Sequence, residues 1–378
     1  MLAPSRAAGV ARTPLAAGHV AVLRPVVGAA AGRRGAPPSV EEVTIELTTV
    51  TDTAAVFFEG AERREYDDLH PDDDYELEGV AFRTLPRPPG ERLATVATVN
   101  DVHFGEVECG VLEGLDLGPI LTAEPGEAPY PETMNRGAIE EITALDPDAV
   151  VAKGDLTTHG IRDEYELFLA AYASAFGDRL AHVRGNHDGY AGEDFASEAP
   201  VEIELPGVRL AVLDTCIPRS TPGQVTAPQL DWLDELGARS DCPVLVFGHH
   251  HVWSPASRNR HETYFGINPD DSERLIDVFA RRPALVGYFA GHTHRNRVRR
   301  FAATGDVPWV EVACVKDYPG AWAEYRVYEG GILQVFHRIS TPEALDWTER
   351  TRVMFGGLYP MYAFGEIGDR SFAIWPRR

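Results

Sequence analysis

Short apolar runs recur along the chain from residue 93 onward, and segments with the spacing of amphipathic helices separate them. The runs cover residues 93–99, 149–152, 181–184, 208–214, 243–247 and 285–290. Each run is short enough to form a strand that is buried on both faces. Between two of them, Leu230, Leu233 and Leu236 fall on one face of a helix, and acidic residues occupy the other face. This alternation predicts a layered α/β domain, which we place at residues 91–340.

A different pattern precedes the α/β domain. Val43, Ile45 and Leu47 alternate with polar residues, which is the period of a strand with one buried face. Farther along, the stretch LHPDDDY at 69–75 resembles the L-x-P-x-x-x-Y corner of fibronectin type III-like sandwiches, in which a tyrosine hydroxyl ties a strand to the preceding turn. We therefore expect a small β-sandwich-like segment and a proline-rich linker over residues 39–90.

Residues 1–38 have a composition from which no core can be built. They contain five arginines and no acidic residue, and much of the remainder is Ala, Gly and Pro. A secretory signal would carry its positive charges before the apolar stretch, whereas here Arg24 interrupts that stretch and Arg33 and Arg34 follow it. We interpret the segment as a disordered tail or an overlong start-site assignment, and a targeting segment is the alternative.

The composition narrows the classes of function. The formal net charge of −23 argues against a protein that coats nucleic acid, because an acidic surface repels phosphate polymers. No apolar run approaches the ~20 residues that span a bilayer. The four cysteines show no C-x-x-C spacing, and we expect reduced, packed thiols. We therefore expect a soluble, cytoplasmic protein whose partner is not a nucleic-acid polymer.

Metal-type ligands follow five of the predicted strands. The stretches are DVH at 101–103, GD at 154–155, GNHD at 185–188, GHHH at 248–251 and GHTH at 291–294. One histidine at a strand end is more often a structural hydrogen-bonder than a ligand, but five such ends in order, each with a glycine at a sharp turn, are not independent accidents. Imidazole and carboxylate together suit Mn, Fe and Zn, whereas all-oxygen sites suit Ca or Mg.

The order D-x-H, G-D, G-N-H-D, H, G-H-x-H resembles the calcineurin-like metallophosphoesterase superfamily, which includes class III cyclic nucleotide phosphodiesterases and glycerophosphodiesterases. Its members hold two metal ions between two sheets flanked by helices, so the resemblance implies a four-layer αββα sandwich here. It also implies a set of ligands. The first metal would be held by Asp101, His103, Asp155 and His294. The second would be held by Asp155, Asn186, His249 and His292, with Asp155 as the bridge.

The same resemblance implies a mechanism with two metal ions, each Mn, Fe or Zn. A hydroxide that bridges them would attack phosphorus in line. His187 follows a ligand by one residue and would protonate the leaving oxygen as a general acid. Asp188 would hold the imidazole of His187 in orientation, as carboxylates beside metal-site histidines do. A capping or packing role is the alternative for either residue.

This chain departs in places from the motifs of many relatives. The second motif reads GDLTTHG, with His159 instead of a carboxylate, and we expect this side chain to point to solvent. The fourth motif offers three histidines. We choose His249 as the ligand because it comes first after the strand, and His250 either packs or lines the substrate pocket. Arg258 and Arg260, in the loop before the fifth motif, either seat a phosphate oxygen or are solvated.

These inferences favour a metal-dependent phosphoester hydrolase, most of all a phosphodiesterase that acts on a cyclic nucleotide or a glycerophosphodiester. A phosphomonoesterase of small metabolites or phosphoproteins is the alternative enzyme. A non-catalytic scaffold with the same fold is the alternative from another class, although a scaffold would be expected to have lost ligands. We expect residues 341–378 to form a C-terminal extension that packs on the domain. The sequence does not decide the oligomeric state, and a homodimer is possible.

Overall fold

The computed structural model describes residues 45–111, 118–193, 195, 199–257, 260 and 265–377. The segment 1–38 that we interpret as a tail lies outside the described residues, and so does Arg258. Within the described ranges, no helix combines the length and the hydropathy needed to cross a membrane.

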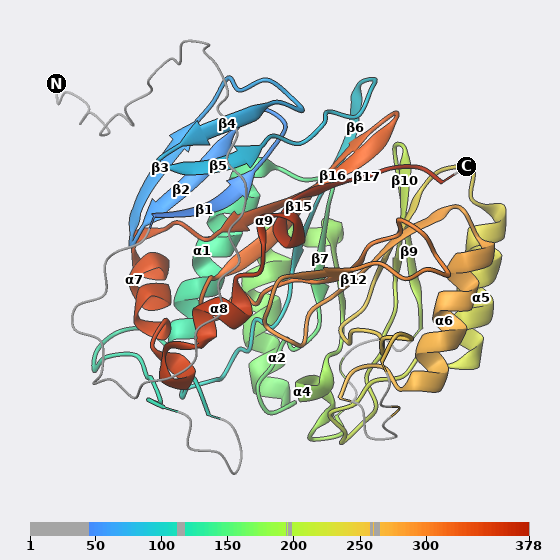
Figure 1. The fold of residues 1–378 in the computed structure, drawn as a ribbon. Helices are drawn as coiled ribbons and strands as arrows, with labels where there is room; N and C mark the ends of the chain where they lie inside the picture. Colours follow the sequence, from blue (N-terminus) through green and yellow to red (C-terminus); the bar gives the residue numbers. More distant parts are fainter. Residues whose placement is uncertain are drawn as a thin grey trace, which may run out of the picture.

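Two six-stranded sheets make up the body of the protein (Figure 1). The first has the order β17-β16-β15-β6-β7-β8, with strands Phe372–Ile374, Gly331–Arg338, Ala321–Tyr328, Arg92–Val99, Ala149–Lys153 and Leu180–Val183. The second has the order β13-β14-β12-β11-β10-β9, with strands Arg297–Arg299, Trp309–Glu311, Leu285–Ala290, Val244–Phe247, Val208–Val212 and Val201–Leu205. All six predicted strands are confirmed, as β6, β7, β8, β10, β11 and β12.

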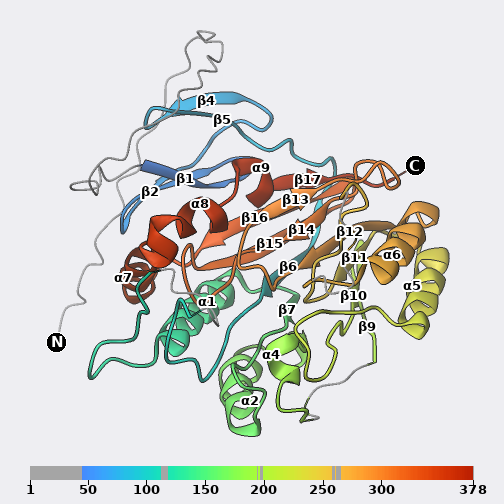
Figure 2. The same cartoon turned by 60° about the horizontal axis from the view of Figure 1, so that its bottom comes forward.

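Apolar side chains from both sheets meet in one buried cluster. Phe247 and Phe289 of the second sheet pack against Tyr325 of the first, with ring centroids 5.5 and 4.9 Å apart. Helices pack on the outer faces (Figure 2). They are α1 (Tyr130–Leu145) and α2 (Arg162–Phe168) on the first sheet, and α5 (Ala227–Arg239) and α6 (Pro269–Arg281) on the second. The predicted α/β class is confirmed, because the apolar faces of sheets and helices are buried against each other.

The segment before β6 forms two small antiparallel sheets. Its strands are β1 (Ile45–Val50), β2 (Ala55–Glu59) and β3 (Glu62–Tyr66) in one sheet, and β4 (Asp74–Leu77) and β5 (Val80–Arg83) in the other. The hydroxyl of Tyr75 accepts a hydrogen bond of 2.7 Å from the backbone N–H of His70, which is the kind of contact that the corner motif predicts. The described strands number five, whereas an immunoglobulin-type sandwich has about seven.

The C-terminal residues pack on the first sheet and on α1. The ring of Trp347 stacks on that of Tyr130 with centroids 4.2 Å apart, and β17 pairs with β16. The remaining helices and helical turns are η1 (Leu169–Ala173), α3 (Ser174–Phe176), η2 (Gly177–Arg179), α4 (Asn186–Gly189), α7 (Pro342–Thr351), η3 (Met354–Gly357), α8 (Tyr359–Ala363) and α9 (Ile367–Arg370).

Arg370 joins this C-terminal part to the N-terminal strand β1. Its buried guanidinium donates to the carbonyl oxygens of Leu47 at 2.7 Å and Thr48 at 2.9 Å. We expect Arg370→Met to lower the free energy of unfolding by about 2–3 kcal/mol, because two buried carbonyls lose a charged donor. Denaturant unfolding measures the change, and Arg300→Met, at an exposed arginine, is the control with an expected change below about 0.5 kcal/mol. Equal effects of the two substitutions would contradict a specific link.

Candidate metal centre

The turns that carry the predicted ligands meet at one end of the two sheets. The strands β6, β7 and β8 run parallel, as do β10, β11 and β12, so their carboxyl ends lie at the same edge of each sheet. Several predicted ligands have left-handed backbone, with φ between 48° and 68°: Asp101, His103, Asp155, His292 and His294. Residues other than glycine rarely adopt this conformation, and such strain persists where the surrounding structure holds functional side chains in place.

Asp101, His103, Asp155 and His294 lie together in this region. Nε2 of His294 is 3.3 Å from Oδ1 of Asp101, and Nε2 of His103 is 3.6 Å from Oδ2 of Asp155. Only 2% of His103 is exposed, yet neither of its ring nitrogens has a hydrogen-bond partner among the described residues. Leaving a buried polar atom unpaired is costly, so this imidazole fits the role of a cation ligand.

A second group lies on the other side of Asp155. Nε2 of His249 is 3.3 Å from Oδ2 of Asp155 and 3.1 Å from Oδ1 of Asn186. Nδ1 of His249 donates to the backbone carbonyl of Lys153 at 2.8 Å. Because a carbonyl only accepts, this contact keeps a proton on Nδ1 and makes Nε2 the nitrogen that can bind a cation, as in metal-ligating histidines.

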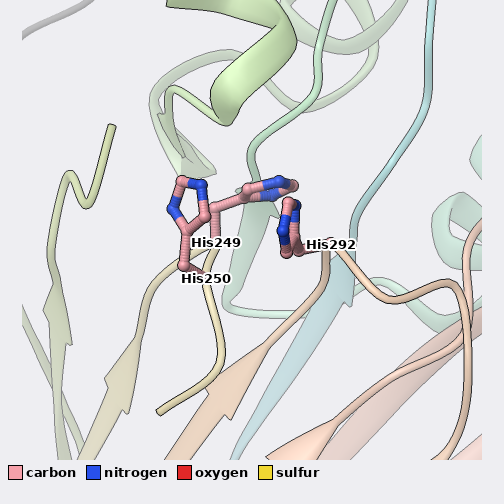
Figure 3. A group of neighbouring side chains, drawn as sticks. All are labelled: His249, His250 and His292. Atoms are coloured by element: carbon pink, nitrogen blue, oxygen red, sulfur yellow. The ribbon is translucent and has the colours of Figure 1, made fainter. Parts of the chain in front are cut away.

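His292 is oriented in the same way. Its Nε2 donates to the carbonyl of Phe265 at 2.9 Å, which leaves the lone pair on Nδ1. Figure 3 shows the imidazoles of His249, His250 and His292 gathered on the turns that follow β11 and β12, and one ring nitrogen of each lies within 4.8 Å of those of the other two.

His250 differs from its two neighbours in its hydrogen bonds. Its Nδ1 is 2.8 Å from Oγ1 of Thr215, and its Nε2 donates to the carbonyl of Thr221 at 3.1 Å. The side chain is fully buried. No ring nitrogen is therefore left for a metal or a substrate, which supports the choice of His249 over His250 and does not support the expected substrate contact of His250.

The second residue expected to contact substrate, Arg260, is engaged in ion pairs. It pairs with Asp270 and Glu273 on α6, and its guanidinium lies 5.3 Å from the centroid of the Trp253 ring. Arg258 cannot be placed, because it lies outside the described residues.

The electrostatics of the centre favour a cation. Burial alone would raise the pKa of Asp155, but the imidazoles of His249 and His187 hold that pKa well below its usual range. Burial lowers the pKa of His249, and the carboxylate of Asp155 overcomes this effect and raises it to about 9. Burial lowers the pKa of His103 far below its usual value and that of His292 to about 3. The centre thus offers an ionised carboxylate at Asp155, neutral imidazoles at His103 and His292, and a proton on His249 that a cation would displace.

His187 stands beside the first group of ligands. Its Nδ1 donates to the carbonyl of Thr158 at 2.7 Å, and its backbone N–H donates to Oδ1 of Asp155 at 2.9 Å. The half-buried ring packs edge-on against that of His103, with centroids 4.6 Å apart. These contacts leave Nε2 of His187 without a partner among the described residues.

The predicted role of Asp188 is wrong, since this carboxylate does not contact the His187 ring. Its Oδ1 accepts from the backbone N–H and the hydroxyl of Thr157, at 2.8 and 2.6 Å. Its Oδ2 accepts from the backbone N–H groups of Leu156 and Gly185, at 3.0 and 2.7 Å. These four donors turn the carboxylate inward, so Asp188 ties the GNHD turn to the turn that follows Asp155.

Two further carboxylates support the centre, and sequence reasoning missed both. Glu164 accepts from the backbone N–H groups of Thr158 and His159, at 3.0 and 2.7 Å, and thereby ties α2 to the turn of the second motif. The His159 side chain is 63% exposed, as expected. Asp317 lies 3.8 Å from Nδ1 of His294. Sequence reasoning singled out neither carboxylate, because Glu164 belongs to no motif, although it follows the second motif by four residues, and Asp317 is distant from His294 in the sequence.

A profile of the family described as Calcineurin-like phosphoesterase matches residues 94–296, which contain all five motifs. A probable cyclic nucleotide phosphodiesterase of Rhodococcus erythropolis is 30% identical over 169 residues, or 41% of this chain and 54% of that protein. A cAMP/cGMP dual specificity phosphodiesterase of Mycobacterium tuberculosis is 32% identical over 163 residues, which cover 40% of this chain and 50% of that protein. A glycerophosphodiester phosphodiesterase of Enterobacter lignolyticus is 26% identical over 187 residues, which cover 44% of this chain and 65% of that protein. The chain thus spans about half of the length of the first two relatives.

A solved structure shares the fold. The crystal structure of a dimetal phosphatase from Danio rerio superposes with a TM-score of 0.50 over 66% of this chain and 97% of that chain. The sequences are 16% identical in this comparison, so the similarity concerns the fold alone.

Proposed function

Because the chain belongs to the calcineurin-like phosphoesterase family, we propose that it hydrolyses phosphoric esters at a centre of two metal ions. The observation that carries this proposal is the convergence of the predicted ligands, from five separate turns, around the buried carboxylate of Asp155. The unpaired imidazole of His103 gives independent support.

The donor set fits two cations. One would be held by Asp101, His103, Asp155 and His294. The other would be held by Asp155, Asn186, His249 and His292. Asp155 would bridge them, because its Oδ2 is near both groups, at 3.6 Å from Nε2 of His103 and 3.3 Å from Nε2 of His249. The mixture of imidazole and carboxylate suits Mn, Fe or Zn. Two such cations lower the pKa of a shared water and neutralise charge on the phosphoryl group.

His187 is the general acid of the proposed reaction. The carbonyl of Thr158 holds Nδ1 as a donor, so the acid form of His187 is the imidazolium, whose Nε2 proton would pass to the leaving oxygen. The hydrogen bond from the backbone N–H of His187 to Oδ1 of Asp155 keeps His187 at a constant position relative to the carboxylate that would bridge the metals.

A phosphodiester, either a cyclic nucleotide or a glycerophosphodiester, is the substrate that we propose. Support comes from the relatives, since the three that are described above are named as phosphodiesterases. A phosphomonoesterase of small metabolites or phosphoproteins is the second candidate. A non-catalytic scaffold is disfavoured because every predicted ligand and the acid are present.

We also propose a finer architecture. Residues 91–340 would form a four-layer αββα metallophosphoesterase domain, which the helices outside both sheets support. Residues 39–90 would form a fibronectin III-like segment and linker, which the contact of Tyr75 supports. Residues 341–378 would be an extension that packs on the domain, as the stacking of Trp347 suggests.

Metal-stripped protein that is reloaded with Mn, or with Fe and Zn, is expected to regain hydrolysis of chromogenic phosphate esters. We expect kcat/KM for a diester to exceed that for the matched monoester at least about 10-fold, which corresponds to ~1.4 kcal/mol in the transition state. A comparable preference for the monoester would replace the diester assignment. Two bound metals without hydrolysis of either ester would favour the scaffold.

A further inference from the structure

The side-chain amide of Asn186 is held by a hydroxyl outside the predicted ligand set. Asn186 is 3% exposed, and its Oδ1 is 3.1 Å from Nε2 of His249. On its other side, Nδ2 donates to the hydroxyl of Tyr190 at 2.6 Å. The amide therefore lies between the ligand cluster and Tyr190.

The orientation of this amide decides whether it can bind a metal. Only the oxygen of an amide coordinates a cation, whereas its NH₂ group is a donor. When the oxygen points to the metal position, the NH₂ group points away and needs an acceptor. A buried donor without an acceptor costs about 1–3 kcal/mol. The hydroxyl of Tyr190 is that acceptor.

Tyr190 is itself well placed for this role. Its hydroxyl is 3.2 Å from Oγ1 of Thr221, and its ring packs against that of His187 with centroids 4.7 Å apart. A hydroxyl has one proton and two lone pairs. Tyr190 can thus donate to Thr221 while it accepts from Asn186. The side chain is 37% exposed, so its ring also forms part of the surface beside the acid.

We propose that Tyr190 is a positioning residue that keeps the oxygen of Asn186 directed at the second metal and thereby sets the affinity of that site. This inference rests on the proposed function, because it takes Asn186 to be a ligand. Tyr190 does not itself coordinate a metal in this arrangement. Since the hydroxyl lies beyond Asn186, its removal weakens one site and leaves the other unchanged.

Tyr190→Phe removes the hydroxyl and keeps the ring. We expect calorimetric titration of the metal-stripped full chain with Mn²⁺ to show two binding steps, one of them weakened about 10-fold and the other changed less than about twofold. Mn²⁺ electron paramagnetic resonance counts the bound ions independently. Tyr165→Phe is the matched control. It removes a hydroxyl whose partner, Nε2 of His182 at 2.8 Å, does not belong to a predicted ligand, so both Mn²⁺ affinities should stay within about twofold of those of the original chain.

Two outcomes would overturn the positioning role. Unchanged Mn²⁺ affinities in Tyr190→Phe would show that the hydroxyl is not needed, and equal weakening of both steps would show a general effect on the fold. In an Asn186→Ala background, Tyr190→Phe should cause no further loss, and an added loss of about 10-fold would mean that Tyr190 acts elsewhere. Normal two-site binding by Asn186→Ala would refute the ligand assignment itself, whereas normal binding by Tyr190→Phe alone refutes only the positioning role.

Discussion

Asp155→Ala is expected to lose both metal ions and to lower kcat at least about 1,000-fold, which corresponds to ~4 kcal/mol. The physical reason is the shared position of this carboxylate. Nε2 of His103 and Nε2 of His249 approach its Oδ2 from the two ligand groups, at 3.6 and 3.3 Å. Without Asp155, each group loses an anionic ligand, and like charges on two adjacent cations are left unscreened. Elemental analysis of the purified protein, together with kcat on a chromogenic diester, measures the result.

Asp178→Ala is the matched control, since Asp178 is exposed and lies outside the metal centre. Its metal content and kcat should stay within about twofold of the original chain. Asp155→Asn tests the charge with little change of shape, so it remains informative if Asp155→Ala folds poorly. Normal content of both metals in a folded Asp155 variant would refute the bridging assignment.

His187→Ala is expected to keep both metals and to slow esters with poor leaving groups by about 10²–10⁴-fold. Esters whose leaving groups are already stable as anions need no proton, so their kcat should fall less than about 10-fold. A plot of log kcat against the pKa of the leaving group should therefore become steeper. The position of the imidazole supports this expectation, because Thr158 holds Nδ1 and leaves Nε2 for the substrate.

His159→Ala is the control for the acid. This side chain is 63% exposed and contacts Glu164, which retains its bonds to the backbone when the ring is removed. For His159→Ala, the slope of log kcat against the pKa of the leaving group should match that of the original chain. If good and poor leaving groups were slowed equally by His187→Ala at normal metal content, His187 would have a role other than proton donation.

The residues of the candidate metal centre could be predicted because their signals are local. Each motif follows an apolar run directly, and alternation of runs and helices places the runs side by side as parallel strands. The carboxyl ends of such strands share an edge, so Asp101 and Asp155 meet although 53 residues separate them in the numbering. The resemblance to a known family then predicted which side chain would bind which metal.

The orienting contacts could not be predicted, because the packed structure decides in which direction a side chain on a turn points. Asp188 follows His187 in the sequence, yet four donors from the turns before it hold its carboxylate away from the imidazole. Glu164 and Tyr190 were missed for the same reason. Their partners lie in turns, and a turn shows its direction only after the sheets have packed.

By itself, the sequence determined the class of fold, the strands and the residue types of the metal centre, because apolar period, turn glycines and motif order depend on neighbouring residues. The tertiary structure decided how each side chain is used. His249 is the available ligand because its Nδ1 meets the carbonyl of Lys153 from the opposite sheet, while both nitrogens of His250 are bonded elsewhere. Hydrogen bonds fix the protonated nitrogen and the rotamer of each side chain. They form only at donor–acceptor distances of about 3 Å, and the packing of the two sheets decides which groups come that close.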